Sequence, residues 1–161
     1  MTFRRGVFHS PKIFFRVLAF AEAVSWTLLI GGMILRATHG LDVAVTIGGG
    51  IHGFVFLAYG ATAVVVAKNQ RWSGGPAATA IISAIIPYAT VPVDLWLKRT
   101  GRLDGPWRRE ATDDARDHAW HDRLLRVLLR RPALVGGALA AAVVLLFVVL
   151  LALGPPPVPK A

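Results

Sequence analysis

Residues Ile13–Leu35 read IFFRVLAFAEAVSWTLLIGGMIL, a run in which Arg16 and Glu22 are the only charged side chains. A helix of this length crosses a hydrocarbon core of about 30 Å, because each residue adds about 1.5 Å. A cleaved signal peptide does not fit, since the stretch is too long, contains Glu22 and is followed by no small-residue cleavage site. The stretch therefore predicts a retained transmembrane helix.

Three further apolar runs have a similar length, at Val43–Ala67, Ala77–Leu97 and Ala133–Leu153. Short loops join the first three runs and predict antiparallel neighbours in an up-down-up bundle. The alternation typical of a β-barrel is absent. The sequence therefore predicts an all-α membrane protein with four transmembrane helices, at about 13–35, 43–67, 77–97 and 133–153.

The composition agrees with a membrane protein, since 55% of the residues are hydrophobic and 17% are charged, against about a quarter charged in soluble domains. Cysteine is absent, which excludes a disulfide scaffold, a thiolate metal site and a cysteine nucleophile. Arginine far outnumbers lysine, and alanine, glycine and valine are abundant, which indicates a GC-rich bacterial genome. We expect a multi-pass protein of the bacterial plasma membrane.

Outside the runs, the chain divides into a basic N-terminal segment (1–12), an Arg-rich connector (101–132) and a Pro-rich tail (154–161), around a three-helix domain at 13–100. An apolar stripe beginning at Trp120 predicts an amphipathic helix at about 110–131, lying in the membrane interface. The alternative is a helix that continues into the fourth span until Pro132. In either case, lipid headgroups are the expected partners of Arg123, Arg126, Arg130 and Arg131.

The net charge of +9 does not indicate nucleic acid, because the excess lies beside the predicted spans and no nucleic-acid-binding signature is present. Basic residues in that position bind anionic lipid.

The orientation of the chain in the membrane stays open. With four spans, the positive-inside rule favours a cytoplasmic connector, whereas the first three spans alone favour a cytoplasmic N-terminus.

Glu22 and His52 lie at nearly the same depth, each nine residues into its predicted span and about 14 Å from its end. Antiparallel packing therefore predicts a Glu22–His52 contact. Ser25 shares the face of Glu22, and Tyr59 shares that of His52. Such an intramembrane cluster is either structural glue that fixes helix register or a proton or ligand site.

Gly49 and Gly53 form a small-residue surface where another helix can approach closely. Pro87 and Pro92 predict kinks in the third span. Asp94 falls near the end of that span, where we expect it at the interface.

No catalytic motif is present, so we expect no enzyme and no cofactor. One weak metal-like constellation occurs, although a solvated mixed-charge helix predicts the same residue types. Its members are Asp114, Asp117, His118, His121 and Asp122.

Four stretches carry a family resemblance: Phe15–Ser25, Gly49–Tyr59, Arg71–Ser73 and Ile86–Thr90. They combine a Glu-x-x-Ser motif with Gly-x-His-Gly. With these, residues 13 to about 100 resemble the small bacterial integral membrane proteins of unknown function known for a His-Gly pair, the YdzA-like proteins with a DUF3817-type domain. The resemblance implies a three-helix membrane domain, common in actinobacteria and sometimes appended to transporter-like proteins, and it implies no activity.

Together these features favour a non-enzymatic assembly or accessory protein that packs through a Glu/Ser/His/Gly seam, with itself or with a larger membrane complex. One alternative is an oligomeric transporter subunit or proton-linked carrier that uses Glu22 and His52. Another is a protein that binds anionic lipid through its Arg-rich helix.

Overall fold

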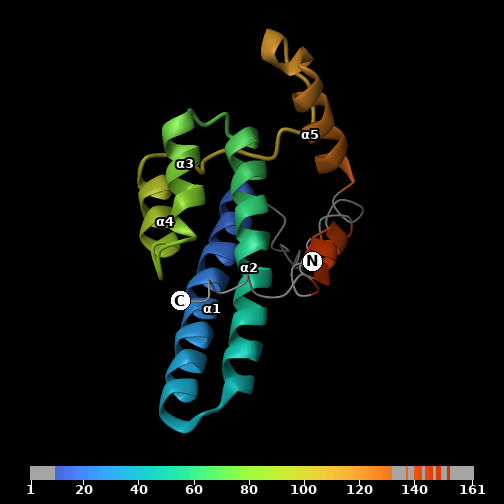
Figure 1. Cartoon of the computed structure of the whole chain (residues 1–161). Helices are drawn as coiled ribbons and strands as arrows, with labels where there is room; N and C mark the ends of the chain where they lie inside the picture. The colour runs from blue at the N-terminus through green and yellow to red at the C-terminus, as the bar shows by residue number, and fades with distance from the viewer. Residues whose placement is uncertain are drawn as a thin grey trace, which may run out of the picture.

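Figure 1 shows the computed structural model, which describes residues 10–131, 137, 140–142, 144–146, 148–149 and 152. The all-α class is confirmed for this part of the chain. The elements bounded within it are α1 (Pro11–His39), α2 (Asp42–Asn69), α3 (Gly74–Ser83), α4 (Thr90–Arg99), the short 3-10 helix η2 (Ala115–His118) and α5 (Trp120–Arg130).

The helices α1 and α2 form a long antiparallel hairpin (Figure 1). Ser10 caps the start of α1, because its Oγ accepts a hydrogen bond from Ile13 N at 3.2 Å. Gly40, with φ 66°, ends α1 in the left-handed conformation that glycine adopts without strain. With 29 and 28 residues, α1 and α2 are long and apolar enough to cross a membrane.

Two glycines allow the backbones of α1 and α2 to pack in direct contact. A Cβ on Gly32 would lie 2.5 Å from Ala44 O, and a Cβ on Gly48 would lie 2.5 Å from Leu28 O. Any larger residue at either position would therefore push α1 and α2 apart.

The third predicted span, Ala77–Leu97, is wrong as a single crossing helix. α3 ends at Ser83, residues 84–89 turn, and α4 begins at Thr90. Pro87 lies in the turn, where its missing N–H prevents the helix from continuing, and Tyr88 follows it at a φ of 63°. Pro92 falls in the first turn of α4, where a proline is tolerated. With ten residues each, α3 and α4 are about 15 Å long, half the thickness of the hydrocarbon core.

α3 and α4 return to the end of the hairpin from which they start. Trp72, just before α3, donates from Nε1 to the carbonyl of Arg102, just after α4, at 2.7 Å. Figure 1 shows the two short helices side by side against one half of the hairpin. We call that half (residues 11–27 and 52–69) the covered half and the rest (28–39 and 42–51) the open half. The predicted up-down-up bundle is replaced by two long helices and a helical hairpin that enters and leaves at one end.

The buried core lies in the covered half, where the ring of Phe15 packs at 5.5 Å from that of Tyr59. Side chains from both long helices, both short helices and the start of the connector meet there. They are Phe15, Ala19, Tyr59, Ala63, Val66, Ala80, Ala84, Leu97 and Leu103.

The connector is helical over less of its length than the predicted 110–131. Residues 104–114 are irregular apart from isolated bends, and Asp114 caps η2 by accepting from Arg116 N at 2.9 Å. α5 then begins at Trp120. The predicted fourth span at 133–153 lies largely outside the described residues, as do residues 1–9 and the Pro-rich tail.

Candidate functional site

A polar seam lies between α1 and α2 in the covered half, as the antiparallel geometry predicts. The Ser25 hydroxyl donates to Glu22 O at 2.7 Å and lies 2.9 Å from His52 Nδ1. Because that hydroxyl has one proton, donation to Glu22 O makes Ser25 the acceptor from a protonated His52 Nδ1, and the tautomer of His52 selects this arrangement or the reverse. The carboxylate oxygen Oε1 of Glu22 lies 3.9 Å from the same nitrogen. Glu22, Ser25 and His52 are thus brought together.

The short helix α4 encloses the seam from the other side. Thr90 Oγ1 donates to Ala19 O at 2.8 Å and lies 3.4 Å from Glu22 Oε2. The ring of Trp26 packs on that of His52 at 4.3 Å, and its Nε1 donates to Ala84 O at 3.3 Å. Glu22 is fully buried as a result.

A second buried carboxylate lies nearer the end of the covered half. Asp94, predicted at the interface, is fully buried and accepts from Arg16 Nε at 3.0 Å. Sequence reasoning missed this pair, because its geometry depends on α4 running back along α1. An Arg four residues into a predicted span was the available signal.

In the seam and the neighbouring Arg16–Asp94 pair, three buried polar atoms have no hydrogen-bond partner among the groups of the described chain. They are Glu22 Oε1, Asp94 Oδ1 and Arg16 Nη2. Unpaired polar atoms are costly at membrane depth and uncommon in protein interiors. The seam therefore retains unused capacity to bind a proton or a polar group.

Tyr59 has a different role from the predicted one in the Glu–His cluster. Its hydroxyl donates to Ala80 O at 3.0 Å and lies 3.1 Å from Ser83 Oγ, so it anchors α3 to α2. Of the two glycines expected to pack, Gly49 stands beside the tight crossing at Gly48, and a Cβ on Gly49 would meet nothing closer than Leu29 Cδ1 at 3.7 Å. Gly53 is half-buried on α2.

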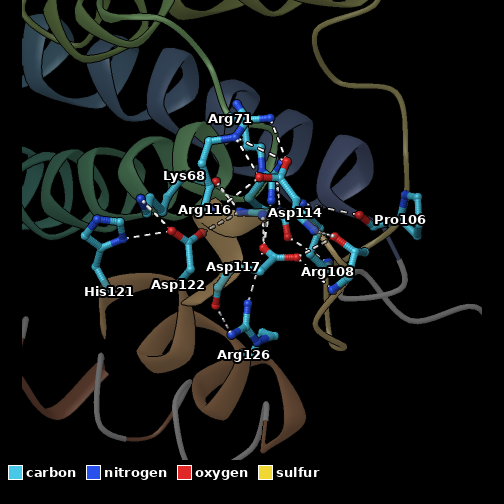
Figure 2. Close-up of polar contacts among 12 residues, drawn as sticks. Lys68, Arg71, Pro106, Arg108, Asp114, Arg116, Asp117, His121, Asp122 and Arg126 are labelled. Carbon is cyan, nitrogen blue, oxygen red and sulfur yellow. Dashed lines mark hydrogen bonds and ion pairs between the residues drawn. The ribbon is translucent and has the colours of Figure 1, made fainter. Parts of the chain in front are cut away.

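Figure 2 shows a second polar cluster, where the connector docks on the end of α2. Asp117 is buried and lies 2.7 Å from Arg71 Nη2 and 3.0 Å from Arg108 Nη1. Asp122 binds Arg108 at 2.9 Å and Lys68 at 3.1 Å. This network fixes η2 and α5 against the long hairpin.

Hydrogen bonds in this cluster favour the charged carboxylates. The backbone and side chain of Thr112, together with Arg71, hold the pKa of Asp117 well below its ordinary range. The side chain and backbone of Arg116, with Arg71, do the same for the pKa of Asp114. Both aspartates are therefore ionised well into acidic pH.

The predicted headgroup arginines divide into two kinds. Arg126 turns inward, where its Nη1 lies 3.3 Å from Asp117 Oδ1. Arg123, Arg130 and Arg131 are exposed. In the metal-like constellation, Asp114, Asp117 and Asp122 are occupied by basic side chains, and no three metal-binding side chains converge within the described residues.

The domain of unknown function DUF3817 matches residues 13–99. A putative membrane protein of Streptomyces coelicolor, SCO5905, is 34% identical over 94 residues, which cover 57% of this chain and 11% of the relative. The uncharacterized membrane protein YdzA of Bacillus subtilis is 30% identical over 91 residues, 56% of this chain and 95% of the relative. No solved structure matches. The matched region covers α1 from its third residue through α4 and includes the whole polar seam. The chain therefore belongs to the DUF3817 family, whose two relatives named here are membrane proteins with no assigned biochemical role.

Proposed function

We propose that the chain is a non-enzymatic accessory protein of the bacterial plasma membrane, which packs against a transmembrane helix of a larger membrane protein. The observation that carries this proposal is an open hollow of about 830 Å³ on the open half of α2. Its lining combines Gly49 and Gly50 with Ile47, Ile51 and Phe54. Small residues in such a surface let a second helix backbone approach closely, and close approach drives helix association in lipid.

The polar part of the predicted seam is unsuited to this contact, because Glu22 and Ser25 are buried within the chain. Their hydrogen bonds hold the protein's own helices together. The glycine part remains accessible, and no other described helix covers it. The hollow is therefore the part of the seam left for a partner.

The relatives support a partner larger than this chain. The domain makes up nearly the whole of the Bacillus protein and about a tenth of the Streptomyces protein. A module that occurs both alone and joined to a large membrane protein fits a role beside such a protein.

Photocrosslinking in the native membrane tests this proposal. A photoreactive residue at Ile51, in the hollow, should give one discrete product with a larger membrane protein, whereas one at Val24, which is exposed on the covered half, should not. Gly49→Leu fills the hollow and should weaken the product about tenfold. Gly60→Leu, a matched change on α2 with free space around it, should leave the product unchanged.

Two outcomes would overturn the proposal. Adducts with lipid alone would mean that the hollow faces the bilayer. A product between two copies of this chain would replace the larger partner with self-assembly.

For topology, we propose that α1 and α2 cross the membrane and that α3 and α4 enter and leave from the cytoplasmic side. The end of the hairpin where α1 joins α2 carries Arg36, in the last turn of α1, as its sole lysine or arginine, whereas the connector and the end of α2 meet at the opposite side with most of the basic residues. If α3 and α4 return to the side from which they start, the N-terminus and the connector lie on the same side of the membrane. The positive-inside rule then places both in the cytoplasm, and the conflict between the two counts disappears.

Because the chain lacks cysteine, single-cysteine variants test this topology directly. In spheroplasts, a membrane-impermeant maleimide should label Thr38→Cys, exposed in the last turn of α1, and should leave Asp113→Cys unlabelled until the membrane is opened. The reverse pattern would invert the orientation. Labelling of both from outside would contradict a one-sided hairpin.

A proton-linked carrier is the second candidate, favoured by the unpartnered oxygen of Glu22 beside His52. It predicts proton uptake into liposomes that contain the protein, and loss of that uptake in Glu22→Gln. The accessory proposal predicts no uptake by either form.

A further inference from the structure

A second cavity, of about 620 Å³, opens where α2, α3, η2 and α5 meet. It lies outside the seam and on the opposite half of α2 from the Gly49 hollow. Its lining divides by chemistry. Val64, Ala67, Ala77 and Ile81 are apolar, while Lys68, Arg71 and Arg116 are basic and Asp122 contributes a carboxylate that pairs with Lys68.

The two kinds of lining lie at different depths. Val64 precedes Lys68 by one helical turn on α2, which is about 6 Å nearer the middle of the hairpin. Ile81 likewise follows Ala77 by one turn as α3 runs inward. Val64 and Ile81 therefore lie nearer the middle of the hairpin, and Lys68 lies nearer its end, at what we call the mouth of the cavity.

The mouth of the cavity carries a net positive charge. Five basic side chains of the cluster in Figure 2 face three carboxylates, so the ion pairs leave positive charge uncompensated. Within the described residues, Arg116 forms an ion pair with Asp114, and its side chain is 70% exposed. Lys68 forms an ion pair with Asp122 and remains partly exposed. Both can therefore contact a further anion.

We propose that this cavity binds one anionic phospholipid, with its phosphate between Lys68 and Arg116 and an acyl chain along Val64 and Ile81. A charged headgroup above an apolar chain matches the division of the lining, and basic pockets between helices on the cytoplasmic side are suited to such headgroups. Trp72 at the same level fits the interfacial position that tryptophan favours. The site rests on the topology proposed above, which the cysteine-labelling experiment tests separately, and it is independent of the partner at the Gly49 hollow.

Native mass spectrometry of the purified full-length protein in detergent tests the site, with phosphatidylglycerol as the probe and phosphatidylcholine as the zwitterionic comparison. The wild type should bind one phosphatidylglycerol with about tenfold preference. Ala77→Trp fills the cavity without changing charge and should abolish this preference. Ala78→Trp, an exposed neighbour on α3 outside the cavity, should retain it.

Charge variants provide the second comparison, since Ala77→Trp could disturb α3. Arg116→Gln should weaken binding about fivefold, and Arg123→Gln, an exposed arginine of α5 outside the cavity, should have less than about a twofold effect. Equal losses in these two variants would reduce the site to diffuse surface attraction. Equal binding by the two tryptophan variants would overturn the cavity, and displacement of the lipid by glycerol phosphate would identify a site for a soluble phosphate.

Discussion

In the covered half of the α1–α2 hairpin, the helices meet through polar groups such as Glu22, Ser25 and His52, while in the open half they meet through Gly32 and Gly48. The difference follows from the number of helices present. In lipid, apolar side chains gain little from leaving the solvent, so association depends on close packing and hydrogen bonds. Polar groups can be enclosed where α3 and α4 complete a shell around them. In the open half, where no further described helix packs against the pair, close backbone approach at glycine holds the two helices together.

The largest expected effect tests the covered half. Arg16→Leu leaves the fully buried Asp94 without its ion pair and should lower the free energy of unfolding by about 3 kcal/mol, measured by denaturant titration in detergent. Lys12→Leu breaks an exposed pair with Asp104 and should cost less than about 1 kcal/mol.

A double variant makes that test specific. Adding Asp94→Leu to Arg16→Leu removes the unpaired charge and should restore most of the loss. If Arg16→Leu were no more harmful than Lys12→Leu, the buried pair would not stabilise the covered half.

The next effect tests the open half. Gly48→Ala places a Cβ 2.5 Å from a backbone oxygen of α1 and should cost about 2 kcal/mol by the same titration, because backbone cannot move aside as a side chain can. Gly31→Ala, which has free space around it, should be neutral or slightly stabilising. Equal effects of the two substitutions would show that the glycine crossing does not hold the open half.

The third prediction concerns the cluster that closes the end of the covered half. Asp117→Asn weakens its contacts with Arg71 and Arg108 and should speed tryptic cleavage of the connector about tenfold, because cleavage follows local opening. Asp113→Asn, which changes the same charge at an exposed neighbouring position, should leave the rate unchanged. Equal rates in the two variants would mean that the network does not hold the connector.

The stability of the docked connector should decrease as the pH falls below the ordinary pKa of an aspartate. Because the pKa of Asp117 is lower in the folded protein than the ordinary value of about 3.9, its stabilising contribution is complete above that value and is lost as the pH falls further. Pepsin cleavage of the connector, corrected for the enzyme's own pH dependence, should therefore rise below about pH 4 in the wild type and rise less in Asp117→Asn.

The smallest expected effect tests the hydrogen bond by which Tyr59 attaches α3 to α2. Tyr59→Phe keeps the ring against Phe15 and loses the hydrogen bond to Ala80 O, which should cost about 1 kcal/mol. Tyr88→Phe removes an exposed hydroxyl 3.4 Å from Thr27 and should stay within about 0.5 kcal/mol. A cost for Tyr88→Phe as large as that for Tyr59→Phe would contradict a buried anchor at Tyr59.

The Glu22–His52 contact could be predicted from the sequence because depth along two antiparallel helices depends on residue count alone. The third span could not, since an apolar run with two prolines is compatible with one kinked helix or two short ones. The choice depends on whether Ala80, Ala84 and Thr90 find partners on the long helices, as they do here. The tight crossing at Gly48, one residue before the glycine that the pattern indicated, depends on the rotation of α2 about its axis.

Hydrophobic length and residue depth, both local properties of the chain, were enough to determine the helical class, the two long helices and the level at which their polar groups meet. The family resemblance was also readable from motifs in the sequence. The tertiary structure decided that α3 and α4 return to one side, that Asp94 is buried against Arg16, and that the connector closes on Lys68 and Arg71. These features depend on contacts between residues far apart in the chain, and no local pattern specifies which of the available polar partners will meet.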